Sequence, residues 1–158
     1  MLANLFPKQF DNTYRGLWLA VWIFVPVVAV RAVQGANSIL FTRDVLIKAD
    51  GIPLDSLGLA GGQVVLSLFA LLGLNLLVVP LLSAIALIRY RAMIPLLFLV
   101  LLFLQLGARV IIALHPIART GDTPLGFYIN LVLLMLTVIG FALSLQTRSA
   151  LPARATAI

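Results

Sequence analysis

Long apolar runs alternate with short polar segments along the chain. The runs cover residues 16–33, 59–88, 92–114 and 124–145. A transmembrane helix needs about 20 mostly apolar residues, and each run is close to or above that length. The pattern therefore predicts an all-α, polytopic membrane protein. We expect an antiparallel bundle of four transmembrane helices that forms a single membrane domain over residues 1–158.

The connections between these runs have different lengths. The longest, residues 34–58, is an outer loop in which residues 38–48 form either a short interfacial helix or a strand. The sequence DGIP at 50–53 is typical of a turn. The three residues 89–91 leave room only for a tight antiparallel hairpin. Residues 146–158 form a polar, basic tail that we expect in the cytoplasm.

Composition excludes a soluble protein. The chain is 63% hydrophobic and 10% charged, with a mean hydropathy of +1.16, whereas soluble domains are about 45–50% apolar. The net charge of +6 does not indicate nucleic-acid binding, because the basic residues flank apolar runs and form no stripe interleaved with aromatic residues. The absence of cysteine excludes disulfides, thiolate metal sites and cysteine nucleophiles.

Basic residues are distributed unequally between the two sides of the predicted bundle. One side carries Lys8, Arg15, Arg89, Arg91, Arg148 and Arg154, and the other carries Arg43, Lys48 and Arg119. Cytoplasmic segments carry the excess of lysine and arginine. This bias predicts that both termini and residues 89–91 are cytoplasmic and that residues 34–58 and 115–123 lie outside.

Five polar side chains are predicted to share one layer of the outer half. They lie ~20–26 Å from the cytoplasmic edge at 1.5 Å per helical residue. The five are Arg31, Asn75, Gln105, Arg109 and Asn130. The inner half carries only Ser83, Thr137 and Ser144 as polar side chains. A channel or proton pump needs ionisable groups or a polar lining, so one protomer is a poor candidate for either. A pore formed between protomers is compatible with the sequence.

The polar layer has two interpretations. In the first it is an outward-facing ligand site, in which Arg31 and Arg109 bind an anion such as a phosphate headgroup and the amides orient it. In the second the arginines extend to the interface or pair with Asp44, Asp50 or Asp55, and the amides join helix to helix.

No pattern indicates catalysis. His115 is the only histidine, so a bis-histidine haem or a multi-histidine metal centre is excluded within one chain. A role for His115 as the single axial ligand of a pigment is compatible with the sequence. The loop carboxylates Asp44, Asp50 and Asp55 are expected to pair with Arg43 or Lys48. We predict no catalytic residue, no metal site and no cofactor.

Several short strings support a resemblance. FDNTYRG (10–16), ADGIPLDS (49–56), RYR (89–91), RTG (119–121) and GFYIN (126–130) together resemble a group of uncharacterised four-span bacterial inner-membrane proteins. The resemblance implies a multi-pass protein of the bacterial inner (plasma) membrane. It implies no activity, so no functional residue is carried over.

We therefore expect a non-enzymatic structural or accessory subunit of a homo-oligomer or larger membrane complex. The alternative is an outward-facing protein, or a transporter component, that binds an anion or anionic lipid through Arg31 and Arg109. A lipid-headgroup enzyme based on the acidic outer loop is the third candidate. The expected partners are the lipid bilayer, further copies of the chain or a larger membrane complex, and a possible anionic lipid; no nucleic-acid partner is expected.

Overall fold

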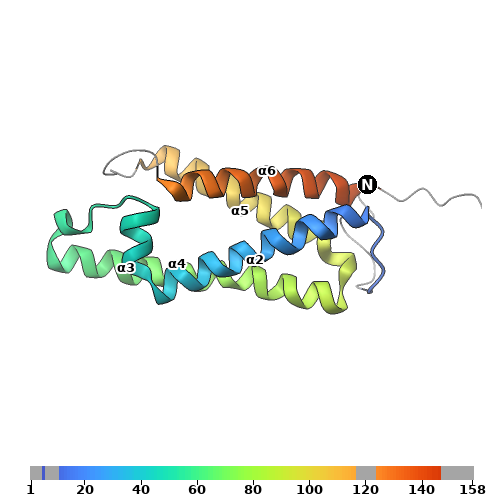
Figure 1. Ribbon diagram of the computed structural model, residues 1–158, viewed down its shortest axis with the longest axis horizontal. Helices are drawn as coiled ribbons and strands as arrows, with labels where there is room; N and C mark the ends of the chain where they lie inside the picture. Colours follow the sequence, from blue (N-terminus) through green and yellow to red (C-terminus); the bar gives the residue numbers. More distant parts are fainter. Residues whose placement is uncertain (1–4, 6–10, 117–123, 147–158) are drawn as a thin grey trace, which may run out of the picture.

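Four long helices make up most of the molecule (Figure 1). The computed structural model describes residues 5, 11–116 and 124–146, and no strand occurs among them. The helices are α2 (Trp18–Leu40), α4 (Gly58–Arg89), α5 (Ile94–Leu114) and α6 (Leu125–Leu145). Each is long and apolar enough to cross a membrane. The predicted all-α, four-span architecture is confirmed.

The helices run alternately up and down, which gives the bundle two distinct ends (Figure 1). The start of α2, the short 3-10 helix η3 (Arg91–Met93) and the end of α6 meet at one end, which we call the hairpin end. The opposite, loop end carries α3 (Thr42–Asp44), the π-helical turn η1 (Val45–Ala49) and the 3-10 helix η2 (Leu54–Leu57). The segment expected to be either helix or strand is therefore helical.

The first long helix extends further than its apolar run predicts. Helix α2 continues to Leu40, whereas the hydrophobic pattern ends at residue 33. The added turns pack closely on α4, because a Cβ on Gly35 would lie 3.1 Å from the carbonyl oxygen of Gly73. Where the sequence predicts a turn at 50–53, the chain bends at Asp50, and Gly51 adopts a φ of 67°. Glycine tolerates this conformation because it has no Cβ.

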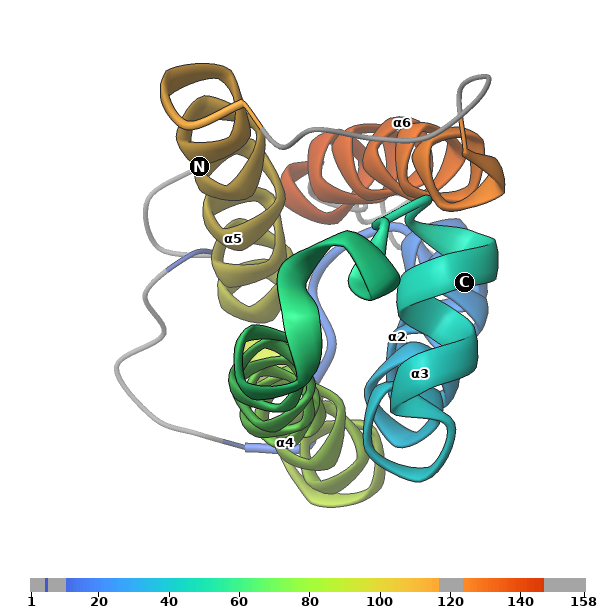
Figure 2. The same ribbon diagram turned by 90° about the vertical axis from the view of Figure 1, so that its left-hand side faces the viewer.

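The packing is unequal among the four helices. Seen from the loop end, they occupy the corners of a square in the order α2, α4, α5, α6 (Figure 2). Helix α2 packs extensively against α4 and α6, whereas α5 packs mainly against α6 and much less against α4. Helix α5 therefore depends on α6 for most of its tertiary contacts.

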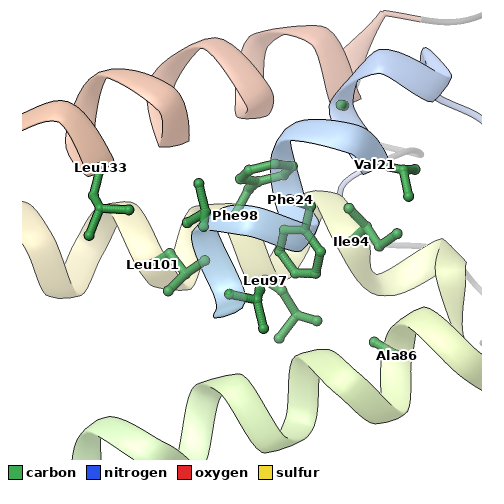
Figure 3. Packing of buried hydrophobic residues seen from close by; sticks show 11 residues of the cluster. Val21, Phe24, Ala86, Ile94, Leu97, Phe98, Leu101 and Leu133 are labelled. Carbon is green, nitrogen blue, oxygen red and sulfur yellow. The ribbon is translucent and has the colours of Figure 1, made fainter. Parts of the chain in front are cut away.

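The apolar core is concentrated towards the hairpin end (Figure 3). Phe24 of α2 and Phe98 of α5 are fully buried. Their rings meet edge to face, with centroids 4.8 Å apart and planes at 65°. Helix α6 approaches Phe98 closely at Gly140, where a Cβ would lie 2.6 Å from the ring carbon Cε1. Such interlocking holds helices together where surrounding lipid removes the hydrophobic driving force.

Tyr14 joins the start of α2 to the end of α6. The Tyr14 ring packs edge-on against Trp18 at 6.1 Å, and its hydroxyl lies beside Gly16, which also approaches the carbonyl oxygen of Ser144. The hydroxyl is buried without a hydrogen-bond partner among the described residues. Burial raises the pKa of Tyr14 to about 12, because the charged phenolate is disfavoured away from water.

Candidate functional site

Arg31 and Asn130 join α2 to α6 in the loop-end half of the bundle. The Arg31 Nη1 atom donates to Oδ1 of Asn130 at 3.0 Å and to Oε1 of Gln34 at 2.9 Å. Gln34 lies one turn along α2 from Arg31, so the two side chains share a face of that helix. The arginine is half-buried and is held by neutral amide oxygens.

Arg109 reaches the same part of α6 from the neighbouring helix. Its guanidinium carbon lies 5.7 Å from the ring centroid of Phe127, a cation–π arrangement. Phe127 and Asn130 are one turn apart on α6, so both arginines approach its first turns. The site therefore concentrates two cations on one short stretch of α6.

The loop carboxylates are engaged elsewhere. Lys48 Nζ lies 2.8 Å from Oδ1 of Asp44, and Arg43 Nη2 lies 3.2 Å from Oδ1 of Asp55. The hydrogen bond and charge of Lys48 lower the pKa of Asp44.

Asp50 lies against α6, where a Cβ on Gly126 would come within 3.1 Å of its Oδ1. Over residues 11–116 and 124–146, no carboxylate is within ion-pair distance of Arg31 or Arg109.

Gln105 lies one turn deeper on the α5 face that carries Arg109. Its Nε2 donates to Oγ1 of Thr137 on α6 at 2.9 Å, and the threonine hydroxyl donates to the carbonyl of Leu133 at 2.6 Å. The Oε1 of Gln105 is buried and has no hydrogen-bond partner in the described structure. A buried acceptor that makes no hydrogen bond costs about 1–3 kcal/mol.

Asn75 is separate from the other four predicted residues. Its Nδ2 donates to the carbonyl of Leu71 within α4 at 3.0 Å, and the residue is exposed. The predicted layer thus resolves into three parts. Arg31 and Asn130 are hydrogen-bonded to each other beside Arg109. Gln105 is hydrogen-bonded to Thr137 one turn deeper, and Asn75 donates to a backbone carbonyl of its own helix.

Sequence reasoning did not identify three residues of this arrangement as site members. Gln34 is signalled only by its position three residues after Arg31. Thr137 is signalled only as a polar side chain within an apolar run, and Phe127 carries no sequence signal that distinguishes it from a packing residue. We call Arg31, Gln34, Arg109, Phe127 and Asn130 the two-arginine cluster.

Other surface features do not coincide with this cluster. A shallow, open depression at the loop end is lined by Leu40, Phe41, Thr42, Arg43, Asp44 and Leu66. His115 is exposed at the end of α5. Within the described ranges, no three residues among histidine, cysteine, aspartate and glutamate are grouped so as to hold a metal ion.

Comparison of the chain with protein-family models, curated proteins and solved structures gave no match.

Proposed function

We propose that this protein is a non-enzymatic membrane protein that binds an anionic group of the phosphate class through Arg31 and Arg109. The observation that supports this most directly is the approach of two guanidinium groups to the first turns of α6 without a carboxylate at ion-pair distance in the described structure. Bound phosphate would supply a negative charge at this position.

Electrostatics favour such a ligand. An arginine within a spanning helix costs on the order of 2.5–3.5 kcal/mol at the bilayer centre on insertion scales, and less near the interface. The neutral oxygens of Gln34 and Asn130 offset part of this cost for Arg31. Guanidinium groups bind phosphate oxygens through paired, charge-assisted hydrogen bonds. A phosphate between the arginines would offset the repulsion between them as well.

The proposal includes an orientation. Arg15 precedes α2, Arg89 ends α4 and Arg91 begins η3, so all three lie at the hairpin end. The positive-inside bias favours that end on the cytoplasmic side of a bacterial inner membrane. The two-arginine cluster would then open towards the outer leaflet. A green fluorescent protein fused to the C-terminus should fluoresce, because it folds in the cytoplasm and not after export in unfolded form.

Calorimetric titration of the protein in neutral detergent tests the binding. Dihexanoyl phosphatidylglycerol, sodium phosphate and zwitterionic dihexanoyl phosphatidylcholine serve as the three probes. Arg31→Gln and Arg109→Gln should each weaken binding of the anionic probes by about tenfold or more, since a hydrogen bond to a charged group is worth about 1.5–3 kcal/mol. Arg89→Gln, at the hairpin end, removes the same charge and should not change the affinity.

A variant at Asn130 separates loss of ligand binding from structural damage. Asn130→Asp is nearly isosteric and places a carboxylate 3.0 Å from Nη1 of Arg31, where the amide oxygen now lies. It should raise thermal stability and abolish anion binding, because the internal carboxylate replaces the ligand. Undiminished affinity in both Asn130→Asp and Arg109→Gln would refute the proposed site.

A separate observation supports a second candidate function, that of an accessory subunit. Five consecutive residues at the loop end of α5, Val110 to Leu114, are exposed on every side of the helix. A bundle helix normally keeps one face covered, so a neighbouring subunit could cover this turn. Light scattering after gel filtration tests this function, and a monomer with no co-purifying chain would contradict it.

A further inference from the structure

One face of α5 loses its protein cover halfway along the helix. Leu97 and Leu101 are 5% and 3% exposed, whereas Leu104 and Ile111 are 47% and 61% exposed, and Ala108 between them is also exposed. These residues recur at spacings of three and four, so they share a face. The face is covered near the hairpin end and uncovered towards the loop end.

Helix α4 shows the same change on the face that meets α5. Ser83 and Ala86 are 0% and 1% exposed, but Leu72 and Leu68, on the same side of the helix, are 54% and 61% exposed. Ala86 lies across from α5 in the core (Figure 3), and the two helices are well separated at the loop end (Figure 2). We call the uncovered residues the α4–α5 seam: Leu68, Leu72, Leu104, Ala108 and Ile111.

The seam adjoins the two-arginine cluster. Arg109 directly follows Ala108, and its side chain turns towards Phe127 of α6. From Ile111 to Leu104 the seam runs ~10 Å along α5, away from the loop end and towards the core. An apolar strip therefore begins at the level of the cations and continues deeper into the bundle.

We infer that the seam holds an acyl chain of an anionic lipid whose phosphate is bound by Arg31 and Arg109. This inference rests on the proposed function and adds that the ligand is a lipid, not a free anion. A lipid enters from the side of the bundle, so it needs no aqueous path. Its phosphate would lie at the level of the arginines and its chain along the seam.

Charge favours a lipid over a second copy of the chain. The four long helices carry no acidic residue, and Asp44, Asp50 and Asp55 lie in the segment between α2 and α4. A helix from a second copy would cover the seam with apolar side chains but would bring no carboxylate to the guanidinium groups. An anionic lipid supplies apolar cover and negative charge together.

Photocrosslinking in bilayers tests the inference. Ala108 in the seam, or Ala113 as a matched control, is replaced by p-benzoylphenylalanine. Both alanines are exposed on α5, but five residues of helix place Ala113 on the far side. The proteins are irradiated in membranes of equal phosphatidylglycerol and phosphatidylcholine, and adducts are identified by mass spectrometry. We expect severalfold enrichment of phosphatidylglycerol adducts at position 108 relative to 113, and loss of that enrichment in Arg109→Gln.

The outcomes separate this inference from the proposed function. Equal adduct compositions at the two positions, with arginine-dependent phosphate binding intact in calorimetry, would overturn the lipid assignment alone. Equal compositions together with no anion binding would overturn both. A crosslinked dimer at position 108 in place of lipid adducts would assign the seam to a second copy and overturn the inference.

Discussion

Gly140 offers a quantitative test of the packing between α5 and α6. A Cβ built on Gly140 would lie 2.6 Å from Cε1 of Phe98 and closer still to Cζ, with Cγ2 of Ile23 at 3.2 Å. Carbon atoms pack favourably at about 3.5–4.0 Å. Gly140→Ala therefore requires the ring or the helix to move by about 1 Å.

The ring has little freedom to move. Phe98 is fully buried and its other side contacts Phe24, whose centroid is 4.8 Å away. Overpacking of this kind costs about 1–3 kcal/mol, whereas replacing glycine by alanine within a helix gains about 0.5–1 kcal/mol. The expected net effect of Gly140→Ala is a loss of about 0–2.5 kcal/mol of unfolding free energy.

Gly107→Ala is the matched control, because a Cβ on Gly107 meets nothing within 4 Å. Both variants change helix propensity alike, so the difference between them should equal the overpacking cost of about 1–3 kcal/mol. Unfolding by sodium dodecyl sulfate in mixed micelles, followed by circular dichroism, measures both free energies. Adding Phe98→Leu to Gly140→Ala should recover part of the loss. Equal stabilities of the two alanine variants would refute the close packing of α6 on Phe98.

Three further predictions concern other parts of the molecule. Gly73→Ala should lower the thermal midpoint, because its Cβ would lie 2.8 Å from Cβ of Ser38 and force α2 away from α4; circular dichroism during heating checks this. The pKa of Tyr14 is raised from 10.0 to about 12, so its neutral form stabilises the fold below pH 10, and that contribution should fall as the pH rises from 10 through 12. In a pH titration followed by tyrosinate absorbance at 295 nm, Tyr14→Phe should remove the absorbance increase near pH 12. Lys48→Ala should raise the depressed pKa of Asp44 towards its ordinary value and leave thermal stability nearly unchanged, since exposed ion pairs contribute little; carboxylate chemical shifts in a pH titration measure the first effect, and an unchanged shift profile would contradict it.

The lengths of the apolar runs were sufficient to predict the four spans, because a run of that length has few alternatives to crossing a membrane. They misplaced the end of the first helix, since hydropathy scores Gln34 and Gly35 as polar or neutral. The structure gives both a role inside the bundle: the Gln34 amide accepts from Arg31, and Gly35 allows α4 to approach. A tertiary contact extended the helix where local composition favoured a loop.

The candidate site shows a different limit. Counting residues along a helix gives the depth of a side chain but not the direction in which it points. Arg31 and Asn130 share a depth and are bonded, whereas Asn75 points away on α4. Because α4 is apolar on every side, its sequence contains no periodic signal to fix its rotation. Neighbouring helices determine that rotation, and their positions are not encoded locally.

The weak packing between α4 and α5 has a consequence for how the chain is assembled in the membrane. These helices are joined by the shortest connection in the described chain, yet α5 packs mainly on α6. Membrane insertion of a nascent chain proceeds from its N-terminus, so α5 enters the bilayer before its principal neighbour does. A chain truncated before Leu125 and released from the ribosome should therefore hold α2 and α4 together, while α5 keeps only its smaller contacts with them. Helix α6 then completes the bundle.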